Sequence, residues 1–283
     1  MQTDRNVEMI SSALAKDNRL TLRELAAKTR LTFYTVFVII KTILQLTLKC
    51  AKWVPKILTK EQKAKRKNSA SENIFLHNLD PEFFETHIVT GDETWVHHYT
   101  PETKRQSKQW LPKWFPRPHK AIRKLSAKKV LATIFWDSKG VLLVDFVHKG
   151  TTITGEYYAN LLRKLLQKIR YKRPGMEEEG IFLLHDNASP HTSNVSQAAI
   201  SNLGFIQLSH PAYSPDMAPS DYYLFPKLKK FLAKNPSTSD DEVEKTTKRY
   251  LAQKLPDFYA RGIADLRHRW NRCVELRGAY VEN

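Results

Sequence analysis

The sequence has few cysteines and no long apolar run. Two cysteines in 283 residues, Cys50 and Cys273, cannot build a disulfide framework or a zinc cluster. The most apolar stretch, residues 33–48, contains Lys41 and falls short of the roughly 18 unbroken apolar residues that a membrane-spanning helix needs. Residues 1–17 are too polar and charged for a secretory signal peptide. We therefore expect no membrane segment and a reducing compartment.

Acidic residues are scarce relative to basic ones. The chain has 29 Asp and Glu against 46 Lys and Arg, which gives a formal net charge of +17 and a pI of about 9.7. The excess lies in residues 1–80, with a net charge of +8, and in residues 101–129, with a net charge of +9. An excess of this size favours a polyanionic partner, most often nucleic acid, over the alternatives of a merely basic soluble protein or a membrane-surface protein.

Residues 1–50 have the pattern of a small all-α domain. A first amphipathic helix is followed by a second that begins with a capping box, formed by Thr21 and Glu24. Thr32 can cap a third helix, which we expect to run to Leu44. Three short helices with a tight turn between the second and third are typical of a helix-turn-helix DNA-binding domain.

The third helix has few groups that read bases. It is mostly apolar, FYTVFVIIKTIL over residues 33–44, whereas direct readout needs side chains that hydrogen-bond base edges. Arg30 also occupies the preceding turn, where a glycine is usual. An exposed apolar helix is alternatively a protein contact. The candidate DNA-contacting residues of this segment are Thr32, Tyr34, Thr35 and Lys41.

Residues 51–80 are predicted to be a charged, partly helical linker. The sequence WVP at residues 53–55 interrupts the helical periodicity, and Trp53 and Lys56 are candidate DNA contacts there. The basic run at residues 63–67 is either a nuclear import signal, a contact to the DNA backbone or a solvated helix face.

From residue 81 the pattern becomes that of an α/β (α+β) domain, with β-rich runs followed by alternating helices and strands. Residues 129–147 contain a hairpin signal between two such runs. We expect strands at residues 87–90, 129–136, 140–147, 180–184 and 205–208, and helices at residues 155–171, 193–202, 221–233 and 239–277, the last with breaks near Pro256 and Gly262.

Three aspartates lie at the ends of predicted elements. Asp92 follows a strand, Asp186 follows a strand that carries no other charge, and Asp221 begins a helix. We expect Ser220 to cap that helix. Carboxylates are the hard oxygen ligands that Mg²⁺ prefers, and two Mg²⁺ ions can clamp the attacking and leaving oxygens of a phosphodiester. Taken singly, each aspartate is better explained as a turn or helix-start residue, so its assignment depends on the surrounding motifs.

The motifs around these aspartates resemble those of mariner-family DNA transposases, and the 34 residues between Asp186 and Asp221 match the family's spacing. The resemblance runs from about residue 4 to the end. It implies a ribonuclease-H-like catalytic domain over residues 81–283, with Asp92, Asp186 and Asp221 as its catalytic and metal-binding residues. The matching motifs are TGDETW at residues 90–95, HDNASPH at 185–191, HPAYSPDMAPSDY at 210–222, WVP at 53–55 and GAYVE at 278–282.

The same resemblance implies an activity and partners. It implies a Mg²⁺-dependent DNA transposase and endonuclease, with two ions per active site and Mn²⁺ able to substitute, that cleaves and transfers strands in cut-and-paste transposition. The implied partners are double-stranded DNA, as transposon terminal inverted repeats and target DNA, and a second copy of the chain in a homodimer, in the nucleus. Asn187 and His191 lie beside the active site in the motif, where they either orient a ligand or phosphate or close a loop.

Residues 101–129 combine basic side chains with Trp110, Trp114 and Phe115. Such residues neutralise phosphates, stack on exposed bases or pack against a partner, although a solvated loop is the alternative. In mariner transposases the corresponding insertion is a clamp between the two subunits. The candidate DNA contacts here are Lys113, Arg117, Lys120 and Arg123.

The chain departs from the family at its start. Mariner transposases carry two helix-turn-helix modules before the linker, and only the second is recognisable in this sequence. A decayed or domesticated DNA-binding protein without transposition activity is therefore the alternative to an active enzyme.

Overall fold

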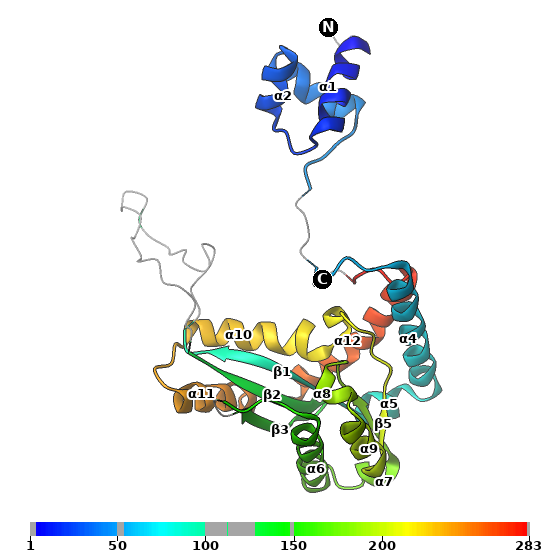
Figure 1. The fold of residues 1–283 in the computed structure, drawn as a ribbon, viewed down its shortest axis with the longest axis vertical. Coiled ribbons are helices and arrows are strands. Elements are labelled where there is room, and N and C mark those ends of the chain that lie inside the picture. Colours follow the sequence, from blue (N-terminus) through cyan, green and yellow to red (C-terminus); the bar gives the residue numbers. More distant parts are fainter. Residues whose placement is uncertain (1–3, 50–53, 100–111, 113–127, 148–149, 282–283) are drawn as a thin grey trace. The chain divides into compact units, whose positions relative to one another are not determined.

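The computed structural model describes residues 4–49, 54–99, 112, 128–147 and 150–281. The chain divides into two compact units (Figure 1), Met1–Pro55 and Lys56–Asn283. Each unit has its own apolar core. Within the described ranges, no helix combines the length and the apolar character needed to cross a membrane.

The first unit is a three-helix domain. It contains α1 (Asp4–Lys16), α2 (Leu22–Thr29) and α3 (Phe33–Val38), and α3 continues into a π-helical turn, η1 (Ile39–Ile43). The capping box at Thr21 is present, and Arg30 ends α2 in the left-handed conformation, at φ 56°. The buried core consists of Ile10, Leu25, Val36, Ile39 and Ile40.

The π-helical turn differs from the continuous α-helix predicted through Leu44. The amide of Leu44 donates to the carbonyl of Ile39 at 2.8 Å, five residues back, as the wider π turn requires. The turn leaves both Ile39 and Ile40 buried beside Val36. Packing of these two adjacent side chains therefore outweighs the regular winding that periodicity alone predicts.

The second unit is built on one mixed five-stranded sheet. Its strands are β1 (Ile88–His97), β2 (Lys129–Asp137), β3 (Gly140–Val147), β4 (Ile181–Leu184) and β5 (Phe205–Gln207). Their order is β3-β2-β1-β4-β5. The first three strands form an antiparallel meander, and β4 and β5 run parallel to β1.

Helices cover both faces of this sheet (Figure 1). One apolar core joins the sheet to α6 (Gly155–Lys172) and α9 (Asn194–Asn202). A second core joins it to α4 (Lys60–Leu79), α5 (Pro81–His87), α10 (Phe225–Lys234), α11 (Asp240–Ala252) and α12 (Pro256–Glu275). Strand β4 shows the division, because Leu183 belongs to the first core and Leu184 to the second. The remaining short elements are α7 (Met176–Glu179), α8 (Ser189–Thr192), η2 (Pro215–Met217) and η3 (Ser220–Leu224).

Much of the predicted linker belongs to the second unit. Residues 60–79 form α4, which packs against α12, and Arg66 in its middle is fully buried. The basic run at residues 63–67 is therefore not a freely exposed segment, although its lysines are exposed. Trp53 lies outside the described residues, so its predicted DNA contact is not placed by the structure.

Helix α12 is continuous through Gly262, where the sequence predicted a break. A Cβ atom at this position would lie 2.7 Å from Tyr223 Cδ1 and 2.8 Å from Trp136 Cη2. The carbonyl of Gly262 accepts a hydrogen bond from the Tyr222 hydroxyl at 2.7 Å. The glycine thus permits close packing of aromatic rings on the helix and does not end it.

Candidate active site

Asp92 lies within β1, whereas the sequence predicted that it follows a strand. The parallel pairing of β1 with β4 ends at Thr90, but the antiparallel pairing with β2 continues to His97. Asp92 therefore has a firmly paired backbone just beyond the carboxyl end of the parallel pairing. The preceding Gly91 has no room for a side chain, because its Cβ would lie 2.3 Å from the Phe135 ring.

The other two aspartates reach the same edge from different elements. Asp186 follows the end of β4 by two residues, as predicted. Asp221 lies in the π-helical turn η3, which leads into α10. The predicted cap at Ser220 is wrong: this buried hydroxyl accepts a hydrogen bond from Trp136 Nε1 at 3.0 Å and caps no backbone amide.

The structure brings the three predicted carboxylates together. Asp92 and Asp221 are joined by a side-chain hydrogen bond, and Asp186 is near enough to influence both. Burial raises the pKa of Asp92 well above its usual range, and the negative charges of Asp221, Glu93 and Asp186 raise it further. Burial also raises the pKa of Asp221. Such mutual destabilisation of negative charge is what a bound cation relieves.

Asp186 is paired instead with a buried histidine. His191 Nδ1 lies 2.7 Å from Asp186 Oδ1, and His191 Nε2 lies 3.5 Å from a carboxylate oxygen of Glu93. Burial disfavours the imidazolium, but the hydrogen bonds and attraction of Asp186 and Glu93 outweigh it and raise the pKa of His191 to about 10. His191 thus occupies the place beside the carboxylates that its motif predicted.

Aromatic packing fixes this histidine from behind. Tyr158 lies 4.0 Å from the His191 ring, centroid to centroid, and its hydroxyl is 3.0 Å from His185 Nδ1. Burial, with repulsion from His191, lowers the pKa of His185 to about 3, so this second imidazole is neutral. Neither Tyr158 nor Glu93 was singled out from the sequence; the adjacency of Glu93 to Asp92 was the available signal.

A groove of about 320 Å³ opens beside Asp186 and Asp221. The side-chain amide of Asn187 donates to the carbonyl of His210 and joins two of the loops that line the groove. Asn187 therefore closes a loop, which was one of the two roles expected for it. Tyr213 also lines the groove, and the ammonium of Lys56 lies 4.3 Å from its ring centroid.

The donor set suits a hard divalent cation, but its present arrangement does not complete a metal site. Among the described residues, no group of three or more His, Cys, Asp or Glu side chains is arranged so that it could hold a metal ion. The reason is local: Asp92 and Asp221 are hydrogen-bonded to each other, while Asp186 is bonded to His191. Separation of Asp92 from Asp221, and rotation of Asp186 away from His191, would free carboxylate oxygens for a cation.

The loop that carries Asp221 is anchored by a buried ion pair. Arg66 donates to both carboxylate oxygens of Asp216, at 2.9 and 2.6 Å, and to Ser214 Oγ at 2.6 Å. It also donates to the carbonyl of Gly278 at 2.9 Å. Asp216 is thereby occupied in a structural contact, which agrees with the sequence motif in assigning the site to Asp221.

The predicted DNA contacts of the first unit are only partly available. The hydroxyl of Thr32 caps α3 and lies 2.8 Å from the hydroxyl of Thr35, so these groups already hydrogen-bond each other. Tyr34 and Lys41 are exposed. The predicted contacts in the basic insertion lie outside the described residues; they are Lys113, Arg117, Lys120 and Arg123.

Comparison with known proteins connects this geometry to transposases. A family model described as Transposase (partial DDE domain) matches residues 100–178. The Mariner Mos1 transposase of Drosophila mauritiana is 34% identical over 236 residues, which cover 83% of this chain and 67% of that protein. Histone-lysine N-methyltransferase SETMAR of Homo sapiens is 34% identical over 97% of this chain, but the chain spans only 40% of its length.

The solved structures agree. The Mos1 transposase paired-end complex with left transposon end superposes with a TM-score of 0.82 at 30% identity, covering 98% of this chain and 80% of that one. The mixed sheet and its carboxylate edge therefore define a DNA transposase with a ribonuclease-H-like catalytic domain, as the sequence predicted. Within that class, the chain belongs to the mariner family of transposases.

Proposed function

We propose that this chain cleaves and transfers DNA strands in cut-and-paste transposition, with Asp92, Asp186 and Asp221 as its catalytic residues. The observation that carries the proposal is the convergence of three carboxylates from β1, the β4 loop and η3, with the pKa of Asp92 raised by burial and by its acidic neighbours. In a structural role, such like charges would be unfavourable without a compensating cation.

Asp92, Asp186 and Asp221 would hold two divalent ions, Mg²⁺ or in its place Mn²⁺. The ions would supply charge neutralisation and an activated oxygen nucleophile for attack on a phosphodiester. Support comes from the Mos1 paired-end complexes, which have been solved with Mg and with Mn. In this chain, His191 would release Asp186 and keep its contact with Glu93, while the Asn187 amide holds the groove loop in place.

The proposed substrates are duplex DNA segments: the terminal inverted repeats of a transposon and a target. The Mos1 relative forms a paired-end complex with a left transposon end, which supports repeat DNA as a partner and a homodimer as the working form. The nucleus is the proposed compartment, because the substrate is chromosomal DNA. The domain roles proposed are helix-turn-helix binding for residues 1–50, linkage for residues 51–80 and catalysis for residues 81–283, with a clamp at residues 101–129.

The test is metal-dependent nicking of supercoiled plasmid by the purified full chain. Asp221→Asn keeps the side-chain shape but removes a charge and a good Mg²⁺ ligand, so the nicking rate should fall at least ~10³-fold while DNA binding is nearly unchanged. Asp241→Asn, at an exposed helix start, is the matched control and should nick normally. Undiminished nicking by Asp221→Asn in Mg²⁺ would refute the catalytic assignment.

A second candidate function is DNA binding without transposition. The observation that favours it is the apolar exposed surface of α3, where Phe33, Tyr34 and Phe37 face solvent in place of base-reading groups. Metal-dependent nicking by the wild-type chain decides between the two candidates.

A further inference from the structure

A basic pocket of about 390 Å³ lies at the β2–β3 hairpin, and none of the three aspartates lines it. Strand β2 runs antiparallel to β1, so the β2–β3 hairpin lies toward the start of β1, whereas Asp92 lies in the middle of β1, two residues beyond its parallel pairing with β4, and Asp186 follows the end of β4. The pocket is lined by residues of this hairpin, of the end of α6, and of α11 and the segment that follows it. Its basic lining residues are Lys139, Lys172, Arg173, Lys248 and Lys254.

Only part of this positive charge is neutralised by carboxylates. Arg173 binds the fully buried Asp137 through two hydrogen bonds, at 2.7 and 2.9 Å. Lys248 lies 3.9 Å from Glu244, a distance at which an exposed pair is weak. Lys172 donates to two main-chain carbonyls of the edge strand β3, at 2.8 and 3.1 Å.

The cations are nevertheless held in place. Lys254 lies 4.3 Å from the ring centroid of Tyr250, and Lys248 lies 5.1 Å from that of Phe146. Burial lowers the pKa of Lys172, and repulsion from Arg173 and Lys168 lowers it further, against the opposing attraction of Asp137. The pocket is thus a positively charged surface on which Lys172, Lys248 and Lys254 contact main-chain carbonyls or aromatic rings, and none of the three aspartates lines it.

We propose that this pocket binds the phosphate backbone of a second duplex DNA segment, separate from the one held at the three aspartates. The inference rests on the proposed function, in which a transposon end and a target duplex must both be held. The apolar residues of the lining, Val141, Val144 and Leu251, offer no side-chain donor to a small buried anion. The cations instead stand on three separate elements around an open hollow, which suits an extended chain of phosphates.

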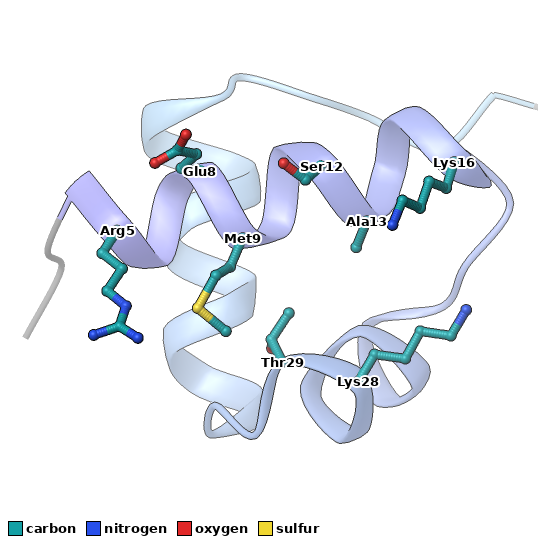
Figure 2. Close-up of a pocket in the computed structure, with 8 residues that line it drawn as sticks. All are labelled: Arg5, Glu8, Met9, Ser12, Ala13, Lys16, Lys28 and Thr29. Atoms are coloured by element: carbon teal, nitrogen blue, oxygen red, sulfur yellow. The ribbon is translucent and has the colours of Figure 1, made fainter.

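The first unit has its own basic groove, but it is a weaker candidate. Figure 2 shows Arg5, Lys16 and Lys28 around it, between α1 and α2. Glu8 lies in the same lining, and its carboxylate reduces the positive charge of this groove.

The experiment uses the full chain in EDTA, bound to an immobilised duplex, and measures capture of a fluorescent duplex of unrelated sequence at several salt concentrations. The double variant Lys248→Glu, Lys254→Glu should reduce capture roughly tenfold or more. The slope of the logarithm of the binding constant against the logarithm of the salt concentration should become shallower by about two. The matched control is Lys245→Glu with Arg249→Glu, which makes the same change of charge on α11 but outside the pocket. Lys139→Ala, on the exposed hairpin, should give a smaller loss in the same direction.

Equal losses in both double variants, or no loss in the pocket variant, would overturn the proposal. Displacement of the second duplex by polyglutamate as readily as by duplex DNA of equal charge would also overturn it, since it would indicate an acidic polypeptide ligand. Thermal unfolding of each variant shows whether the fold is kept, and Lys139→Ala keeps the test informative if the charge reversals unfold. Nicking in Mg²⁺ is measured separately, so a wild-type chain that captures a second duplex without nicking would contradict the proposed function and leave the pocket intact.

Discussion

The two units differ in the size of their apolar cores. In the second unit, Trp136, Tyr158 and Trp270 are almost wholly buried within cores on the two faces of one sheet. In the first unit, Phe33 and Tyr34 are 50% and 75% exposed on a helix with a core of five buried residues beneath it. The sheet that carries Asp92 therefore rests on a large apolar core, whereas the surface of α3 that is expected to read DNA bases is itself largely apolar.

The largest test of this contrast is Arg66→Ala in the second unit. The substitution leaves Asp216 partly buried without its partner, and removing one member of a buried ion pair costs about 3–5 kcal/mol. The free energy of unfolding, measured by denaturant titration of the full chain, should fall by that amount. Lys65→Ala, at the exposed neighbouring position on α4, should change it by less than about 0.5 kcal/mol. A loss under about 1 kcal/mol for Arg66→Ala would show that the ion pair of Arg66 with Asp216 contributes little to the stability of the second unit.

The second test asks whether the first unit reads sequence at all. With few base-reading groups on α3, we expect terminal-repeat DNA to be preferred over scrambled duplex by well under the ~10³-fold typical of specific binders. A second variant removes four basic side chains of the insertion by changing Lys113, Arg117, Lys120 and Arg123 to Ala. If these residues touch phosphates, the slope of the logarithm of the binding constant against the logarithm of the salt concentration should become shallower by roughly three to four. Titrations at several salt concentrations measure both quantities. Strong preference for one repeat would show that α3 reads bases despite its apolar surface.

The third test concerns the charge of His191, which lies beside the carboxylates of Asp186 and Glu93 in the second unit. Because its pKa is raised from 6.5 to about 10, His191 should remain protonated at pH 8 in the metal-free chain. The stability contributed by this imidazolium is complete below pH 6.5 and is lost as the pH rises through about 10. Nitrogen chemical shifts of the ring, followed by NMR, measure the titration, and Asp186→Asn should move it to lower pH. A His191 midpoint near 6.5 would contradict the ion pairs described at the site.

The smallest expected effect is Arg30→Gly in the first unit. Arg30 adopts φ 56°, a conformation that costs a non-glycine residue about 1–2 kcal/mol and that glycine adopts freely. Glycine also loses more entropy on folding, which offsets part of this gain. The free energy of opening of the α2 and α3 amides, measured by hydrogen exchange, should therefore rise by about 0.5–1 kcal/mol. Arg23→Gly, inside α2, should instead lower it by about 1 kcal/mol. Equal effects at both positions would mean that the turn is unstrained.

Local patterns predicted most of the elements of the second unit. The hairpin of β2 and β3, the buried strand β4, and helices α6 and α9 begin and end within a few residues of the expected positions. Periodicity and turn residues carry this information within short windows of sequence. The same local signals placed Asp186 correctly, directly after a strand.

Contacts between distant residues could not be predicted in this way. The pairing of Arg66 with Asp216 spans 150 residues, and in a lysine-rich stretch nothing local distinguishes a buried arginine from its solvated neighbours. Ser220 precedes the helix predicted at residues 221–233, as a capping residue does. Its hydroxyl nevertheless accepts a hydrogen bond from the indole of Trp136, which is 84 residues away in sequence. Gly262 resembles a helix breaker until the rings of Tyr223 and Trp136 are seen against it. In each case tertiary packing decides a role that sequence leaves open.

The contact between Arg66 and residues 278–281 has a consequence for how the protein is made. The amide of Val281 donates to Asp216 at 2.7 Å, and a Cβ on Gly278 would lie 1.9 Å from the carbonyl oxygen of Lys63. The loop before Asp221 therefore rests on residues that a ribosome synthesises some sixty positions later. We expect a nascent chain to fold its strands before the loop next to Asp221 is fixed, because that loop gains these contacts only when residues 278–281 have emerged.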